Sequence, residues 1–505
     1  MHTPDPLLPD WLMRCAGNFP TRLAVQCGQT RWTFAELDRQ ATRLAQQLAT
    51  AGVQASDRVA LLASNGLAFV TCVHALTRLG AVLVPLNTRL TPAELRWHLQ
   101  DVRASLLVSD TSQRSRAITL SATYPNLPHL TLTTDPQRGI VTLDPQPEAG
   151  VPLRTLIDLN ATQAILYTSG TTGRPKGAII TYGMQWWNAI GSALNLGHRP
   201  DDRWLACLPL FHIGGLAILM RSVISGTSVI VHERFDPVAV NHAITHDGVT
   251  IVSVVAIMLQ RMLAALDASG PNNHYPHTLR CILLGGGPAP RPLLEDCARR
   301  GIPVVQTYGL TESCSQAVTL APEDALHKLG SAGRPLLPVQ LCILRDGQPV
   351  PPGEPGEIFL RGPTITPGYA DRPDATTRAF HNGWFATGDL GYLDTEGYLY
   401  VLDRRTDLII SGGENIYPAE IEAVLMTHPA VAAAGVCGQP DPQWGQRPVA
   451  FVQLRPGSTA SADELLTYAA RHLAHYKLPI AIHFTDQLPR NAAGKLLRRK
   501  LQHHL

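Results

Sequence analysis

The stretch Tyr167-Thr-Ser-Gly-Thr-Thr-Gly-Arg-Pro-Lys-Gly177 follows an apolar segment, Ala164–Tyr167, that is predicted to be a buried strand. It contains three glycines, four Ser or Thr residues and one lysine. Glycine lets the backbone approach a ligand closely, while hydroxyl and N–H groups contact phosphate oxygens and Lys176 adds a mobile cation. The spacing is not that of a Walker loop, because Gly177 follows Lys176 where that loop requires Ser or Thr. The stretch is predicted to be a phosphate-binding loop; a flexible surface turn is the alternative.

The segments on either side of this loop alternate between helical and strand patterns. The elements predicted before it are a helix at Phe34–Leu48, a strand at Arg58–Ala63, a helix at Ala68–Leu79 and a strand at Ala81–Pro85. Those predicted after it are a helix at Ile251–Leu266 and strands at Cys281–Leu284 and Pro303–Gln306. This alternation is typical of an α/β fold with largely parallel sheets. The polar, Thr- and Pro-rich segment Arg114–Pro152 is predicted to be a loop-rich connection between two α/β subdomains.

The pattern changes twice in the second half of the chain. From about Val339, short strands and turn signals predict a small β-rich unit. After Asp403 the chain predicts a compact α+β segment with helices at Ala419–Met426 and Ala462–His475. The expected fold class is therefore α/β, with a large N-terminal domain at 1–403 and a small α+β C-terminal domain at 404–505. The large domain would hold two α/β subdomains and the β-rich unit.

The bulk composition of the 505 residues is globular, with 45% hydrophobic and 16% charged residues. The formal net charge of +2 argues against strong attraction to nucleic acid or acidic membranes. The nine scattered cysteines form no CxxC pair, which favours buried thiols in a reducing cytoplasm over a zinc cluster or redox pair. Met1–Asp10 lacks signal-peptide features, and the longest apolar stretches, Ile213–Met220 and Ile251–Leu259, are too short to span a membrane. We therefore expect a cytoplasmic protein.

Three further motifs suit a nucleotide. Leu284-Gly-Gly-Gly-Pro-Ala-Pro290 follows a predicted strand, although a tight turn explains a triple glycine equally well. Tyr308-Gly-Leu-Thr-Glu312 offers an aromatic face for a base, a hydroxyl, and a carboxylate suited to Mg²⁺. Thr387-Gly-Asp389 lies fifteen residues before Arg404, and an aspartate and an arginine can both bond to a ribose.

In this order the motifs resemble the adenylate-forming superfamily, which includes acyl-CoA synthetases, luciferases and adenylation domains. The resemblance covers nearly the whole chain and is weakest before residue 50 and at 111–155. It implies an enzyme that uses ATP and Mg²⁺ to activate a carboxylic acid as its acyl-AMP, with Thr168 and Glu312 at the metal. The residues that it assigns to ATP or AMP are Thr168, Ser169, Gly170, Thr171, Thr172, Gly173, Lys176, Gly285, Gly286, Gly287, Tyr308, Gly309, Thr311, Asp389 and Arg404.

The resemblance also implies a mobile small domain that carries a catalytic lysine. Adenylation joins two anions, so a cation that touches both stabilises the transition state. This role falls to Lys495, at the end of Leu488-Pro-Arg-Asn-Ala-Ala-Gly-Lys495, with Thr311 at the α-phosphate. The small domain would then rotate about a hinge at Thr406, where relatives usually carry Asp or Lys. Rotation would bring Ser411-Gly-Gly-Glu-Asn-Ile-Tyr-Pro418 to the site, with Ser411, Gly412 and Gly413 lining the thiol tunnel.

Several segments resemble the o-succinylbenzoate–CoA ligase family of menaquinone biosynthesis, and this resemblance predicts that the acid substrate is 2-succinylbenzoate. The segments are Pro209–Ser222, Ser253–Val255, Gly285–Pro290, Gln306–Glu312, Gly330–Gly333 and Tyr400–Arg405. His212 would sit at the gate between the ATP and acyl sites, unless it is a packing histidine. Arg221 would bind the second carboxylate of a diacid, unless it points to solvent; Arg89 is the next candidate. Ser313, Ser315 and Gly214 would leave room for an aromatic ring.

Three alternatives remain at this stage. They are a CoA ligase for fatty or aryl monoacids, a luciferase-like oxygenase, and an inactive nucleotide-binding relative. Arg221 argues against the first, and the intact thiol-tunnel segment argues against the second. The intact residues Lys176, Glu312, Asp389, Arg404 and Lys495 argue against the third. No carrier-protein segment follows residue 505, so free CoA is the expected acceptor. A homo-oligomer is left open.

Overall fold

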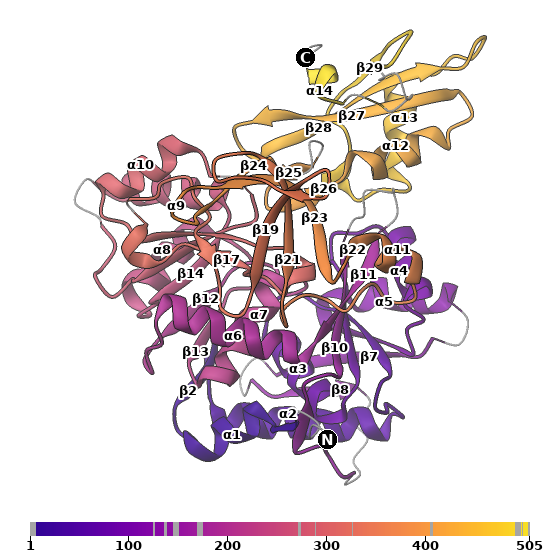
Figure 1. Cartoon of the computed structure of the whole chain (residues 1–505). Coiled ribbons are helices and arrows are strands. Elements are labelled where there is room, and N and C mark those ends of the chain that lie inside the picture. Colours follow the sequence, from indigo (N-terminus) through magenta and orange to yellow (C-terminus); the bar gives the residue numbers. More distant parts are fainter. Residues whose placement is uncertain are drawn as a thin grey trace.

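The structure is a computed structural model of the chain. It describes residues 7–124, 127–135, 139–144, 151–168, 175–270, 274–287, 289–325, 327–403, 408–489, 496 and 498–502. Among the described residues, a large N-terminal part holds four sheets, one of them only a two-stranded pair, and a small C-terminal part holds a fifth and sits beside the β-rich unit (Figure 1). The expected fold class is confirmed. The predicted domain boundary falls at 404–407, outside the described residues.

The first subdomain is built on a seven-stranded sheet in the order β11-β10-β5-β4-β6-β7-β8. Its strands are β4 (Arg58–Leu62), β5 (Val82–Pro85), β6 (Leu106–Asp110), β7 (His129–Thr134), β8 (Val141–Asp144), β10 (Thr162–Thr168) and β11 (Lys176–Thr181). Its helices are α2 (Phe34–Thr50), α3 (Leu67–Leu79), α4 (Pro92–Asp101) and α5 (Arg114–Thr123), with the 3₁₀ turn η1 (Thr111–Gln113). The strands from β10 to β7 run parallel along this order, and β11 and β8 are antiparallel edges.

The prediction that Arg114–Pro152 is a loop-rich connection is wrong. Most of its described residues belong to α5, β7 and β8, and β7 pairs with β6 in parallel while β8 pairs with β7. Threonine favours strands because its branched side chain fits a pleated surface. Thr131 is buried, and the Thr133 and Thr142 hydroxyls are hydrogen-bonded to each other across the pair at 3.0 Å. A threonine-rich segment that looked polar enough for a loop is therefore an edge of the sheet.

The second subdomain is built on a nine-stranded sheet in the order β18-β17-β16-β15-β14-β12-β13-β2-β3, parallel from β16 to β2. Its strands are β2 (Leu23–Cys27), β3 (Thr30–Thr33), β12 (Arg203–Ala206), β13 (Ser228–Val231), β14 (Ile251–Val254), β15 (Cys281–Leu284), β16 (Val304–Tyr308), β17 (Val318–Thr319) and β18 (Arg334–Pro335). Its helices are α1 (Trp11–Asn18), α6 (Tyr182–Leu196), α7 (Ile213–Ser225), α8 (Pro237–His246), α9 (Ala256–Ala268) and α10 (Arg291–Arg299). The 3₁₀ turns are η2 (Thr311–Ser313) and η3 (Pro322–Asp324), and a separate pair joins β1 (Leu7–Pro9) to β9 (Leu156–Asp158).

The predicted helix Ile251–Leu266 is two elements, the strand β14 and the helix α9. All four residues of β14, Ile-Val-Ser-Val, are buried, and they pair with β12 and β15 on both sides. A short apolar run that is buried on both faces has no periodicity to tell a strand from a helix. β-Branched residues favour the strand, and the chain changes to helix at Ala256.

One hydrophobic core joins the two subdomains. It includes Phe34 of α2, Phe69 of α3, Met184 of α6 and Leu216 of α7, together with Val229 of the second sheet. Capping boxes begin two helices of the first subdomain: Thr33–Glu36 opens α2 and Thr91–Glu94 opens α4.

The β-rich unit and the small domain follow the predicted order. The β-rich sheet contains β19 (Gln340–Arg345), β20 (Gln348–Pro349), β21 (Gly356–Arg361), β22 (Phe380–His381), β23 (Trp384–Leu393) and β24 (Leu399–Asp403), with α11 (Pro373–Ala379) beside it. The small domain contains β25 (Ile409–Ser411), β26 (Glu414–Ile416), β27 (Val431–Asp441), β28 (Gly445–Leu454), β29 (Ile482–Phe484), α12 (Pro418–Met426), α13 (Ala462–Ala470), η4 (His475–Lys477) and α14 (Arg498–Leu501). The helix predicted at Ala462–His475 thus ends earlier, at Ala470, and η4 follows it. Among the described residues, no helix is long and apolar enough to cross a membrane.

Candidate active site

A cavity of about 1190 Å³ is lined by residues of both the large and the small domain. Five of its wall residues stand at or just beyond the carboxyl ends of strands, one in the seven-stranded sheet and four in the nine-stranded sheet. They are Thr168 on β10, Cys207 after β12, Val255 after β14, Gly285 after β15 and Gly309 after β16. Ligands of open α/β sheets bind at this edge, because the strand ends and the following turns point their free backbone groups there. The fold therefore converges on one site.

The two residues expected at the metal are in contact. The Thr168 hydroxyl donates to Oε1 of Glu312 at 3.3 Å, and the Tyr369 hydroxyl donates to the same oxygen at 2.9 Å. Glu312 is buried and lines the cavity. Oxygen ligands of this kind suit Mg²⁺, which usually completes its shell with waters and substrate phosphates. The described residues contain no group of three or more His, Cys, Asp or Glu side chains that could hold a metal ion.

The phosphate loop is described only at its ends. Ser169, Gly170, Thr171, Thr172 and Gly173 lie outside the described residues. Lys176 opens β11 and lines the cavity, and its ammonium group lies 5.2 Å from the centre of the Tyr369 ring. Both ends of the loop thus reach the cavity beside Glu312.

Gly285, Gly286 and Gly287, which follow β15, were expected to contact the nucleotide. Gly285 and Gly286 line the cavity. Gly286 has φ of +78°, and a Cβ there would meet Val255 at 2.8 Å, so a side chain is excluded on both grounds. Gly287 is not part of the cavity wall; a Cβ on it would meet Ile410 of the small domain at 2.5 Å.

Tyr308 and Asp389 are joined by a direct side-chain hydrogen bond. The Tyr308 hydroxyl donates to Oδ2 of Asp389 at 2.8 Å. Asp389 lines the cavity, whereas Tyr308 is buried beside Val318 and Leu360 and is not among the wall residues. The structure thus gives Tyr308 a contact that positions Asp389, and its stacking on adenine stays a prediction. Arg404, the other expected ribose contact, lies outside the described residues.

The turn after β16 brings only some of its expected residues to the cavity. Thr311 and Ser315 line it. Ser313 does not: it is fully buried, and its hydroxyl is bonded to the backbone of Leu310. The expectation that Ser313 makes room for the substrate is therefore wrong, because the hydroxyl closes the turn instead. Sequence position alone does not show which side of a tight turn a serine faces.

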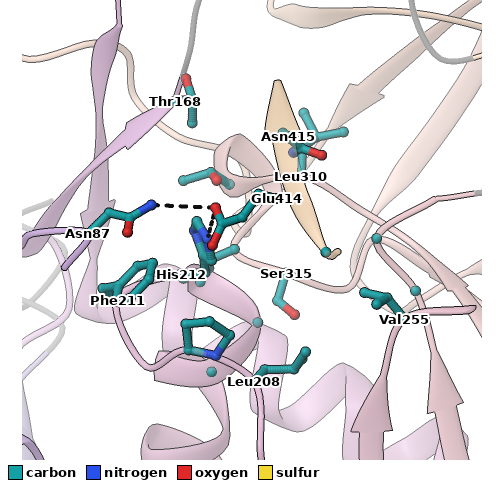
Figure 2. Close-up of a pocket in the computed structure, with 18 of the residues that line it drawn as sticks. Asn87, Thr168, Leu208, Phe211, His212, Val255, Leu310, Ser315, Glu414 and Asn415 are labelled. Carbon is teal, nitrogen blue, oxygen red and sulfur yellow. Dashed lines mark hydrogen bonds and ion pairs between the residues drawn. The ribbon is translucent and has the colours of Figure 1, made fainter. Parts of the chain in front are cut away.

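The small domain inserts a carboxylate into the cavity, as Figure 2 shows. Glu414 of β26 is only 3% exposed. It is bonded to His212 Nε2 at 3.1 Å, accepts from Arg89 Nη1 at 3.0 Å, and accepts from Asn87 Nδ2 at 3.4 Å. Burial by itself would raise the pKa of the Glu414 carboxyl, but His212 and then Arg89 outweigh it and hold that pKa below its ordinary value. The carboxylate therefore stays ionised between the two domains.

The three residues that were expected to line a thiol tunnel directly precede Glu414 in the chain. Gly412 and Gly413, which connect β25 to β26, line the cavity, while Ser411 is buried and does not. A Cβ on Gly412 would collide with the Trp444 ring at 2.7 Å, and Gly413 has φ of +87°. His212 is the residue before α7 and faces Glu414, so its alternative reading as a packing histidine does not hold. Thr406 and Lys495 lie outside the described residues.

Arg221 lies on α7, which is buried along almost its whole length, and it lines the cavity rather than pointing to solvent. It is 5% exposed, its Nη2 donates to Asn188 Oδ1, and its guanidinium lies 5.2 Å from the centre of the Trp204 ring. Its Nε has no hydrogen-bond partner among the described residues. Burial lowers the pKa of Arg221 to about 10, so it is still a cation at neutral pH. A buried cation whose hydrogen-bond partner is a neutral amide suits an anionic ligand.

Several wall residues were missed by sequence reasoning. They are Asn87, Tyr369, Glu414, Trp444 and Lys477. Glu414 lay inside the quoted tunnel segment, and the signal that could have found it is a charged residue flanked by glycines and apolar residues. Asn87, Tyr369, Trp444 and Lys477 stand outside every quoted motif, so their place depended on the three-dimensional fold.

The fold and this cavity define an adenylate-forming enzyme. A model of the AMP-binding enzyme family matches residues 12–370, and a model of the AMP-binding enzyme C-terminal domain matches residues 420–495. The chain belongs to the AMP-binding enzyme family.

Individual relatives match over almost the full length. The chain is 51% identical over 498 residues to a 2-succinylbenzoate–CoA ligase of Geobacillus kaustophilus, covering 98% of this chain and 97% of that protein. Two structures of o-succinylbenzoate CoA synthetase from Bacillus subtilis are both 45% identical and cover 98% of this chain. A double mutant bound with its product analogue has a TM-score of 0.90 and is 99% covered. The complex with ATP and magnesium has a TM-score of 0.73 and is 100% covered.

The Thr168–Glu312 contact generates a first prediction. Glu312→Gln should lower the rate of pyrophosphate release by about 100-fold or more, because an amide is a far weaker magnesium ligand than a carboxylate. Tyr369→Phe removes one hydrogen bond to the same oxygen but keeps the charge, and should cost about tenfold at most. Steady-state rates over a range of Mg²⁺ concentrations measure both. Equal losses in the two variants would exclude Glu312 as a metal ligand.

Proposed function

We propose that this protein is an ATP-dependent 2-succinylbenzoate–CoA ligase of menaquinone biosynthesis. It converts the acid, ATP and CoA to 2-succinylbenzoyl-CoA, AMP and pyrophosphate. Similarity to ligases of this acid over the whole chain supports the reaction, and Arg221 at the wall of the cavity is the observation that carries the choice of acid.

In the first half-reaction, a carboxylate oxygen of the acid attacks the α-phosphorus of ATP and pyrophosphate leaves. Lys176 and the loop before it hold the departing phosphates, and Asp389 with Arg404 holds the ribose. A magnesium ion held by Glu312 and Thr168 would neutralise phosphate charge when bound. Lys495 contacts both the attacking carboxylate and the α-phosphate, which offsets their repulsion.

In the second half-reaction, the CoA thiolate attacks the acyl carbonyl carbon and AMP leaves with the electron pair of the broken C–O bond. The arrangement of the domains seen here suits this step, because Gly412, Gly413 and Glu414 line the cavity. Leu488 and Leu496, which flank Lys495 in sequence, pack in a separate small core and do not line the cavity. The higher TM-score to the product-analogue complex than to the ATP complex supports the same assignment.

The second carboxylate of the acid is bound by Arg221. The diacid places one carboxylate at the α-phosphate and the other deep in the acyl end of the cavity. There it supplies a negative charge and the hydrogen-bond acceptor that Nε of the buried guanidinium lacks among the described residues. A monoacid leaves that cation uncompensated, which makes its binding less favourable.

Three further points belong to the proposal. The small domain, 404–505, moves as a unit relative to 1–403, with the hinge at or near Thr406. A cytoplasmic location agrees with the state of the cysteines, since all nine are free thiols. Association into a homo-oligomer stays a prediction.

The role of Lys495 yields a second prediction. Lys495→Ala should lower acyl-AMP formation by about 100- to 1,000-fold, yet leave thioester formation from pre-made acyl-AMP largely intact. Single-turnover rates for each half-reaction are the measurement. Lys500→Ala, on the exposed face of α14, is the matched control and should change neither rate. A parallel fall in both half-reactions of Lys495→Ala would remove the lysine from the first step.

Gly413 yields a third prediction. Gly413→Leu should slow thioester formation by about tenfold or more and adenylation much less, because the new side chain points at Val255 across the thiol channel. Gly457→Leu is the control: its φ of +75° carries similar strain, but a Cβ there meets nothing within 4 Å. If Gly413→Leu slows both half-reactions to the same extent, Gly413 does not line the thiol channel.

The choice of acid is tested by a fourth prediction. Pyrophosphate release should be fastest with 2-succinylbenzoate in a panel that includes benzoate, coumarate and fatty acids, and thioester should appear only with CoA. Arg221→Met should lower kcat/KM for the diacid by about 10- to 100-fold, since a charged hydrogen bond is worth about 1.5–3 kcal/mol. The ratio of kcat/KM for the diacid to kcat/KM for monoacids should therefore fall.

The control for this experiment is Asn188→Ala. It removes the hydrogen-bond partner of Arg221 but keeps the cation, so the preference for the diacid should survive. A fatty acid as the best substrate would defeat the identification. A diacid preference that persists in Arg221→Met would move carboxylate recognition to another residue, with Arg89 the next candidate.

A further inference from the structure

A second charged side chain of the small domain reaches the large domain, apart from Glu414. Lys477, in η4, is 4% exposed. Its ammonium donates to Glu94 Oε1 of the large domain at 2.7 Å and to Glu420 Oε1 of the small domain at 2.8 Å. Burial by itself would lower the pKa of Lys477, but the carboxylates around it outweigh burial and raise that pKa. The lysine is thus a cation held between two carboxylates.

The two carboxylates have different structural roles. Glu420 lies on α12 of the small domain, so its bond travels with Lys477 whenever that domain moves. Glu94 lies on α4 of the large domain, where its other oxygen accepts from the backbone N–H and the hydroxyl of Thr91 at 2.7 and 2.8 Å. The capping box therefore fixes the orientation of Glu94. Of the two Lys477 bonds, only the one to Glu94 joins the two domains.

This bond and the Glu414 contacts have opposite polarity. In the first contact, the small domain contributes the cation, Lys477, and the large domain contributes the anion, Glu94. In the second contact, the small domain contributes the anion, Glu414, and the large domain contributes His212 and Arg89. Asn87 links the two places, because its amide donates to both Glu414 and the Tyr476 hydroxyl at 3.4 Å. Two opposite charge contacts define one orientation, whereas a single contact would allow the domain to pivot.

We propose that Lys477 is a positioning residue for thiol transfer, whose bond to Glu94 holds the small domain in the orientation that keeps Gly412, Gly413 and Glu414 in the cavity. The inference rests on the proposed function, in which the small domain alternates between two orientations. Bringing Lys495 to the cavity requires that another face of the small domain meet the large one. The Lys477–Glu94 bond is then broken and remade in each catalytic cycle, while the Lys477–Glu420 bond persists.

The test is the Glu94→Gln variant, in which the glutamine keeps the helix cap but loses the charge that faces Lys477. The rate of thioester formation from pre-made acyl-AMP should fall by about tenfold or more, while single-turnover pyrophosphate release is unchanged or faster. Glu36→Gln is the matched control, because Glu36 fills the same position in the capping box of α2 and forms no hydrogen bond or ion pair with the described residues of the small domain. It should change neither rate.

The half-reactions are measured with whichever acid the wild-type protein activates fastest, so an error in the choice of acid leaves this test intact. The Lys477→Arg variant keeps the cation and should retain most of the thioester-forming rate. Equal slowing of both half-reactions in Glu94→Gln, with the melting temperature lowered, would make the bond merely structural and overturn the proposal. An unchanged thioester rate in Glu94→Gln would overturn it as well.

Discussion

The structure depends on a carboxylate that belongs to one domain and is buried in the other. Glu414 belongs to the small domain, but its ionised carboxylate is hydrogen-bonded to three residues of the large domain, His212, Arg89 and Asn87. An ionised carboxylate cannot be buried without such partners, because the loss of hydration costs several kcal/mol. The two domains therefore meet in this orientation or leave the charge exposed to water. The glycines before Glu414 reach the cavity only because its carboxylate is anchored there.

This constraint explains how one cavity can serve two reactions. Activation of an acid needs a cation between two anions, and thiol transfer needs an open channel to the acyl carbon. The carboxyl ends of the strands form one wall of the cavity and hold Thr168, Gly285 and Gly309 at fixed positions. In the proposed function, the small domain is the part that changes position between the two reactions. Ion pairs suit such a moving contact, because each charge can be hydrated again when the domains separate, whereas a large apolar interface would have to be exposed to water.

Specificity has a different physical origin at the other end of the cavity. Arg221 is held on α7 within an apolar core, and its bond to Asn188 orients it without neutralising it. A cation in that position makes the binding of an apolar group unfavourable and the binding of a carboxylate favourable. In the proposed function, the desolvation of this one guanidinium is what disfavours monoacids and favours the diacid.

The sequence by itself determined what depends on short spacings. The glycine- and hydroxyl-rich loop and the Tyr308–Glu312 and Thr387–Asp389 motifs identified the nucleotide chemistry, because the residues of each motif lie within a short stretch of sequence. The rhythm of helices and strands identified the α/β class, and it failed where an apolar run had no period, at Ile251–Leu266, or where threonines looked polar, at Arg114–Pro152. Only the tertiary structure decided which side of a turn Ser313 faces and whether Arg221 is buried. It alone paired His212 with Glu414, which is 202 positions away, and Glu94 with Lys477, which is 383 positions away. The physical reason is that a contact between domains is set by how two finished surfaces fit together, and no local pattern of residues records that fit.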